Sequence, residues 1–208
     1  MLISNNPSSI LLEEYPLKSK LIWNKWTFSN VARNGLLHTV KYLHVNGCPW
    51  DERACSNAAW RGHLDVLKYL HENGCPWNEF ICYDAASCGN LELFKYLHEN
   101  GCPWNEEVCA RVAKYGHLEV LKYLHENGCP WNWQSCLNAA MNRHLEVLEY
   151  LHKNGCPWSS FICSHVAENG HLDVLKYLLD NGCPLSKQVY MSAMEGGHIE
   201  VLIYLYDR

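Results

Sequence analysis

The sequence predicts an all-α fold in which helix–turn–helix units stack into a solenoid. The first observation behind this is a glycine that recurs every 27 residues, and the second is a pair of helical patterns in each interval. The glycines are Gly47, Gly74, Gly101, Gly128, Gly155 and Gly182. A fixed period of this size is typical of solenoids, in which each unit buries its apolar face against its neighbours.

The interval Cys102–Gly128 shows the order of elements in one unit. Asn105 is a strong N-cap type, so a first helix is predicted from about Glu106 to Tyr115. Gly116 is expected to end that helix in a left-handed conformation. The following segment, HLEVLKYLHEN, has the broad apolar stripe of a second helix. No segment alternates with the period of a strand, so no sheet is predicted.

The same slot before each first helix holds a residue that caps helices well. These residues are Asn24, Asp51, Asn78, Asn105, Asn132, Ser159 and Ser186. Residues 21–208 are therefore predicted to form seven repeats, the first degenerate and the last C-terminal. Residues 1–20 are expected to be an N-terminal extension that caps the first repeat with Ile10, Leu11 and Leu12.

Composition and charge exclude several functions. The chain has 208 residues, a formal net charge of −5 and 48% hydrophobic residues, which are enough for a core. No basic run is present, which argues against nucleic acid as a partner. No apolar stretch is long enough to insert into a membrane, and residues 1–20 do not read as a signal peptide. Twelve cysteines without an export signal indicate a reducing compartment.

Three segments carry a resemblance to a known family: AAWRGHLDVLKYLHENG (58–74), VAKYGHLEVLKYLHENG (112–128) and VAENGHLDVLKYLLDNG (166–182). They closely resemble the helical part of ankyrin repeats, and the resemblance extends over about nine tenths of the chain. It implies a right-handed solenoid. The units here are shorter and lack the Thr-Pro-Leu-His turn, so shortened or absent β-hairpin fingers are expected.

Units with Gly-Cys-Pro-Trp also look like ankyrin-type proteins of giant DNA viruses and some protists. This resemblance implies a cytoplasmic protein, located in the host cytoplasm if it is viral.

The recurring cysteines, histidines and tryptophans allow two interpretations, as metal ligands or as residues that pack in the core. No CxxC pair supplies two zinc ligands together, so neither a metal site nor a cofactor is predicted. Packing explains more, because Trp104 and Cys109 occupy the two positions of a hydrophobic staple. In the last unit these positions hold Leu185 and Tyr190, which exchanges large and small residues. Cys88 lies outside the repeated columns, which are the positions that hold the same type of residue when the repeats are aligned. It is the candidate for a reactive thiol, and the alternative is an exposed cysteine without a function.

No enzyme is predicted, because every other cysteine and most histidines belong to a repeated column. A catalytic role for such a residue would imply an active site in each of the seven repeats, which is improbable. The column that opens each second helix is expected to form a structural hydrogen bond to the preceding turn. Its histidines are His63, His117, His144, His171 and His198.

Function is sought in the columns that vary, because the constant columns build the core. The variable face of the first helices carries aromatic and arginine residues, which dominate binding hot spots. The predicted partner-binding residues are Arg53, Trp60, Arg61, Phe80, Tyr83, Asp84, Arg111, Lys114, Tyr115, Trp133, Asn138, Met141, Phe161 and His165. The sequence thus predicts a non-catalytic scaffold for an unidentified protein partner.

The alternative function is a structural or assembly component, viral if the resemblance extends that far. Ile203 and Tyr206 replace the usual Lys and His in the last unit. Such an apolar terminal surface is expected to meet a partner or a second copy, or to continue into a longer array. Weak homo-association through the C-terminal unit is therefore the second hypothesis.

Overall fold

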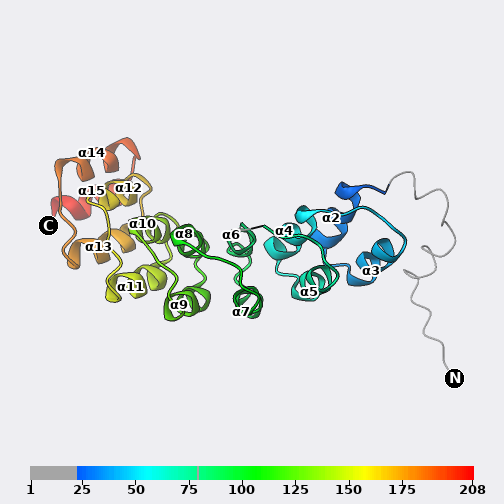
Figure 1. The fold of residues 1–208 in the computed structure, drawn as a ribbon. Coiled ribbons are helices and arrows are strands. Elements are labelled where there is room, and N and C mark those ends of the chain that lie inside the picture. Colours follow the sequence, from blue (N-terminus) through cyan, green and yellow to red (C-terminus); the bar gives the residue numbers. More distant parts are fainter. Residues whose placement is uncertain (1–22, 79) are drawn as a thin grey trace, which may run out of the picture. The chain divides into compact units, whose positions relative to one another are not determined.

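A computed structural model describes residues 23–78 and 80–208 of the chain (Figure 1). It divides into two compact units, Met1–Asp84 (unit 1) and Ala85–Arg208 (unit 2). Unit 1 contains α2 (Lys25–Arg33), α3 (Leu37–Val45), α4 (Glu52–Arg61) and α5 (Leu64–Glu72), and α6 (Ile81–Ala85) spans the boundary. Unit 2 contains α7 (Leu91–Glu99), α8 (Glu106–Tyr115), α9 (Leu118–Glu126), α10 (Trp133–Met141), α11 (Leu145–Lys153), α12 (Ile162–Glu168), α13 (Leu172–Asp180), α14 (Lys187–Glu195) and α15 (Ile199–Tyr206).

The predicted all-α class is confirmed, since the described residues contain helices and turns and no strand. The first helix expected at about Glu106–Tyr115 has these bounds, and Gly116 follows it with a φ of 76°. The stretches that join successive helix pairs are short loops, where a longer repeat would place a hairpin finger. The predicted cap formed by residues 1–20 lies outside the described residues.

The capping column is confirmed at four of its seven positions, Asn24, Asp51, Asn105 and Asn132. The side chain of Asn105, for example, accepts hydrogen bonds from the backbone N–H groups of Glu107 and Val108. Ser186 is the N-cap of α14 as predicted, but its side chain makes no capping bond. The prediction is wrong at Ser159, because α12 begins at Ile162 with Phe161 as its N-cap. Asn78 accepts a hydrogen bond from the backbone N–H of Phe80, but α6 begins later than predicted, at Ile81.

Helices of one kind pack on each other within each unit. In unit 2, α8 contacts α10 and α9 contacts α11, so first and second helices form two rows (Figure 1). The core between the rows is made of aliphatic residues and small residues, including Val112, Leu121 and Cys109, each with an exposed fraction of 0%. Burial of one such aliphatic side chain contributes roughly 1.5–3 kcal/mol to the free energy of unfolding. The apolar positions that recur in every repeat therefore account for most of the stability.

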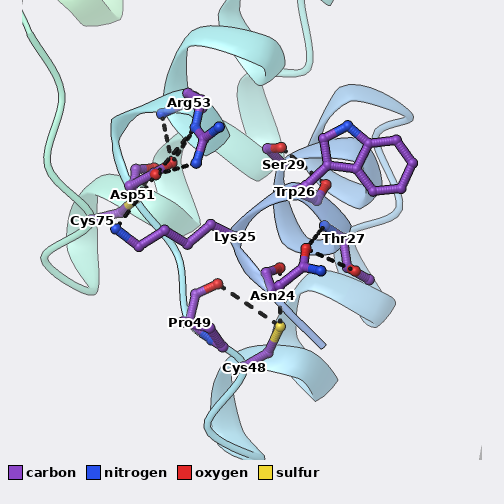
Figure 2. Close-up of polar contacts among 10 residues, drawn as sticks. All are labelled: Asn24, Lys25, Trp26, Thr27, Ser29, Cys48, Pro49, Asp51, Arg53 and Cys75. Atoms are coloured by element: carbon purple, nitrogen blue, oxygen red, sulfur yellow. Dashed lines mark hydrogen bonds and ion pairs between the residues drawn. The ribbon is translucent and has the colours of Figure 1, made fainter. Parts of the chain in front are cut away.

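The cysteine after each repeated glycine holds successive pairs together. The Cys75 thiol lies 3.4 Å from the carbonyl oxygen of Asp51, and the Cys48 thiol lies 3.8 Å from that of Asn24 (Figure 2). In unit 2 the Cys129 thiol lies 3.3 Å from the carbonyl oxygen 24 residues before it. All three cysteines are buried, which confirms the packing interpretation.

The histidine that opens each second helix also joins two repeats. Nε2 of His144 donates to the carbonyl oxygen of Lys114 at 3.0 Å, and His63 and His117 repeat this bond to acceptors 30 residues earlier. The expected structural hydrogen bond is confirmed, but its acceptor belongs to the preceding repeat. His171 differs, because its Nδ1 lies 3.4 Å from the carbonyl oxygen 31 residues earlier.

Candidate functional site

An apolar groove opens on the first-helix side of unit 2. Its volume is about 580 Å³, within the usual range of ligand-binding clefts. We call it the aromatic groove, and it is lined by Trp133, Leu137, Pro157, Trp158, Ser159, Phe161 and His165. Three of the predicted partner-binding residues, Trp133, Phe161 and His165, are thus brought together.

The groove lies beside the late start of α12. In α10 the helix starts at Trp133, directly after the capping residue Asn132. In the next repeat the helix starts at Ile162, and the turn before it carries Phe161 out into solvent. The exposed fractions are 64% for Phe161 and 45% for Trp133, high values for large apolar side chains.

The groove offers apolar surface with one titratable side chain. His165 lies on its edge, and Nδ1 of that ring is 3.8 Å from a carboxylate oxygen of Glu168. Most of the lining side chains are apolar, among them Leu137 and Trp158, so the groove is suited to an apolar segment.

A second cluster of predicted residues lies in unit 1. The guanidinium carbon of Arg33 lies 4.7 Å from the ring centroid of Trp60, and that of Arg61 lies 4.6 Å from it. We call these three residues the arginine–tryptophan stack. Arg33 ends α2, and the other two residues end α4, which packs beside it. The stack thus joins the C-terminal ends of two neighbouring first helices.

Arg53 was predicted on the same face, but its charge is used within unit 1. Its guanidinium lies 2.7 Å from a carboxylate oxygen of Asp51, and Nζ of Lys25 lies 3.6 Å from the same oxygen (Figure 2). The hydrogen bond from Arg53 lowers the pKa of Asp51 against the opposing effect of burial. This carboxylate also caps α4, so the three residues tie that helix to α2.

The remaining predicted residues of unit 2 are partly engaged with each other. Arg111 lies over the ring of Tyr115 at 5.8 Å, and that ring stacks with His117 at 6.2 Å. The Asn138 side-chain amide donates to the carbonyl oxygen of Ala110 at 2.9 Å, which links α10 to α8. Two further predicted side chains, those of Lys114 and Met141, are exposed.

In unit 1, Phe80 has an exposed fraction of 56%, whereas Tyr83 and Asp84 are half-buried. Phe80 precedes a late-starting helix, as Phe161 does.

A histidine, a tryptophan and a tyrosine form a repeated triad. The His125 ring stacks on Trp131 with a centroid distance of 3.9 Å, and its Nδ1 shares a 3.0 Å hydrogen bond with the hydroxyl of Tyr150. The same pattern includes His98 and His152. This column thus joins neighbouring repeats, a role that the spacing did not reveal. The pairing of Trp104 with Cys109 as a staple stays a prediction.

The cysteines form buried contacts rather than a reactive site. The Cys109 and Cys129 sulfur atoms lie 3.2 Å apart, and the neighbouring thiol together with burial raises the pKa of Cys109. Cys88 was expected to be exposed, and this is wrong. It is half-buried, its thiol donates to the carbonyl oxygen of Ala85, and burial raises its pKa. A raised pKa disfavours the thiolate, the reactive form.

Within residues 23–78 and 80–208, no group of three or more metal-ligating side chains was found. Over the same part of the chain, no helix has the length and apolar character needed to span a membrane.

Comparison with known families decides the classification. The family described as "Ankyrin repeats (3 copies)" matches at residues 82–161, 109–188 and 137–208, which together cover more than half of the chain. The chain belongs to the ankyrin repeat family. Ankyrin repeats generally mediate protein–protein interaction.

A solved structure with the same fold is the crystal structure of the human ASB11 ankyrin repeat domain. It matches with a TM-score of 0.64 and 19% sequence identity, covering 77% of this chain and 85% of that chain. A likeness at this identity shows the ankyrin fold and nothing of the partner. The search of curated proteins found no match.

Sequence reasoning missed Arg33, Pro157 and Trp158 as parts of these sites. Arg33 lies 27 residues before Trp60, so alignment of the repeats would have placed the two in one column. The joint residues Pro157 and Trp158 were read as structural, and nothing in their sequence differs from the other joints. Both residues line the groove, and they are as exposed as the proline and tryptophan of the other joints.

Proposed function

We propose that this ankyrin repeat chain is a non-catalytic scaffold that binds a protein partner along the first helices. The aromatic groove of unit 2 seats an extended apolar segment of that partner. The observation that carries the proposal is the exposure of Trp133 and Phe161 on the rim of one groove. Large aromatic side chains beside a desolvated pocket are the usual anchors of protein interfaces.

Site-specific photo-crosslinking in cells tests this proposal. A benzoylphenylalanine at position 161 is expected to crosslink to a partner, and the same residue at the exposed position 126, on a second helix, is the matched control. The variant Trp133→Ala/Phe161→Ala should weaken binding to the captured partner about tenfold or more without changing the unfolding curve. Equal crosslinking from both positions, or unchanged binding, would contradict the proposal.

A second function, self-association, is supported by the last helix. Ile199, Ile203 and Tyr206 have exposed fractions of 70%, 57% and 88%, and their spacing places them on one side of α15. The residues of α13 that correspond to Ile203 and Tyr206 are Lys176 and Leu179. Nζ of Lys176 lies 5.1 Å from the ring centroid of Tyr204, and Leu179 is buried. The face exposed on α15 is thus the one that α13 directs toward its neighbour.

Light scattering at increasing protein concentration tests self-association. The measured mass should rise with concentration for the wild type and remain monomeric for Ile203→Lys/Tyr206→His. Lys187→Ala, an exposed change on α14, is the control and should behave as the wild type. A constant monomer mass for the wild type would rule this function out.

A further inference from the structure

The arginine–tryptophan stack differs from Arg53 and Lys25 of unit 1 in having no counter-charge among the described residues. Arg53 and Lys25 both face Asp51. Neither Arg33 nor Arg61 forms an ion pair with any residue among 23–78 and 80–208. No acidic side chain of the described residues pairs with the two positive charges beside this indole ring, on a chain whose net charge is −5.

Stacking on an aromatic ring leaves the hydrogen-bonding edge of a guanidinium available. The planar face of the group contacts the ring, while its five N–H donors point outward in the plane. Arg33 and Arg61 share the ring of Trp60, which limits the freedom of both side chains. When an anion binds, these arginine side chains therefore lose less conformational entropy than two freely moving arginine side chains would lose.

Two structural effects also favour arginine at these positions. Both residues lie in the last turn of a helix, where the helix dipole attracts a positive charge. The cation–π contact adds stabilisation of its own. A lysine would satisfy both effects, but it lacks the planar fork that holds a carboxylate by two parallel hydrogen bonds. Replacement of arginine by lysine therefore separates a structural role from a binding role.

We propose that the arginine–tryptophan stack binds an acidic segment of the partner, with the two guanidinium groups holding side-chain oxyanions. This inference rests on the proposed function, because it assigns the partner's chemistry at the first helices of unit 1. The charge of the stack is complementary to carboxylates and to phosphorylated side chains alike. Nucleic acid fits less well, because a phosphate backbone needs a longer basic surface than two arginines provide.

Fluorescence anisotropy with the full chain tests the proposal. The probes are labelled decapeptides rich in glutamate, in phosphoserine or in lysine, and a single-stranded oligonucleotide of ten nucleotides. Arg33→Gln/Arg61→Gln should weaken binding of the acidic peptide by about tenfold or more, because charge-assisted hydrogen bonds are lost. Arg33→Lys/Arg61→Lys should weaken it about threefold, since charge remains and the fork is lost.

The matched control is Lys41→Gln/Lys68→Gln, which changes the net charge equally at two exposed second-helix residues. It should alter the affinity less than twofold. An equal loss in this control, unchanged affinity in both arginine variants, or tighter binding of the oligonucleotide than of either anionic peptide would overturn the inference. The relative affinities of the glutamate and phosphoserine peptides identify which oxyanion is preferred.

The two proposals fail separately. If no anionic peptide binds the stack while crosslinking from position 161 persists, the inference is wrong and the scaffold function stands. If crosslinking from position 161 is absent while the acidic peptide binds through Arg33 and Arg61, the proposal that the groove binds the partner is wrong. The proposal that the stack binds an acidic segment then stands.

Discussion

Two turns of unit 2 occupy the same place in successive repeats and differ in the residue that takes the left-handed conformation. Between α8 and α9 the left-handed position is Gly116, with a φ of 76°. Between α10 and α11 it is Arg143, with a φ of 59°, the one non-glycine residue with positive φ among those described. Arg143 also forms a 3.0 Å ion pair with Asp173.

The next histidine shows what this difference changes. A Cβ on Gly116 would lie 2.5 Å from Nδ1 of His144, so the missing side chain lets that ring approach and donate to the carbonyl oxygen of Lys114. His171 follows Arg143, and its hydrogen bond is longer and has moved by one residue. The glycine is thus needed for the contact between repeats as well as for its backbone conformation. The contribution of the next repeat to stability depends on it.

The largest expected effect comes from Gly116→Arg, which copies the irregular turn into the regular one. It should lower the free energy of unfolding by about 2–3 kcal/mol, because left-handed backbone strain and the displaced His144 ring both contribute. Urea unfolding followed by circular dichroism measures this. The control is Gly128→Arg, where φ is 78° and no described atom lies within 4 Å of the added Cβ. That change should cost about 1 kcal/mol, and equal losses would refute the contact explanation.

The comparison of the two histidines themselves gives a smaller effect. His144→Ala should lower the free energy of unfolding by about 1 kcal/mol, because an exposed hydrogen bond at 3.0 Å and the packing of the ring against Gly116 are lost. His171→Ala should cost less than half of this, because its contact is 3.4 Å long. The same urea unfolding experiment measures both. Equal losses would show that the two turns are equivalent, and a larger loss for His171→Ala would contradict the comparison.

Restoring glycine at the irregular turn should raise stability slightly. Arg143→Gly relieves about 1 kcal/mol of backbone strain and loses an exposed ion pair of about 0.5 kcal/mol, so a gain of about 0.5 kcal/mol is expected. Asp173→Asn removes the ion pair alone and isolates its contribution. A loss of stability in Arg143→Gly would show that the arginine contributes more than the strain costs.

The smallest effect is a pH dependence at the irregular turn. Burial lowers the pKa of His171, with further lowering from Arg143 and His198 against the raising effects of the Ala140 carbonyl and Asp173. The folded state then binds fewer protons than the unfolded state, so stability falls as pH drops below about 6.5 toward the folded pKa. Thermal unfolding between pH 7.5 and 5.5 should show a steeper loss for the wild type than for His171→Gln. Identical pH slopes would contradict this sign.

Much of the fold could be predicted from the sequence because each signal is local. Asn105 and Gly116 mark the ends of α8 through capping and backbone conformation, which depend on neighbouring residues alone. The capping prediction failed at Ser159, where the chain forms a turn before Ile162. That exception lies beside the aromatic groove.

By itself the sequence determined the 27-residue period, the paired helices and the burial of the repeated cysteines, because period and apolar pattern are properties of one chain segment. Only the tertiary structure decided which side chains from different repeats meet. It placed Arg33 beside Trp60, His125 against Trp131 and Tyr150, and Phe161 in one groove with Trp133. Such contacts depend on how one repeat is shifted and rotated on the next. That geometry is fixed by the packing of whole helices, which no single segment of the sequence specifies.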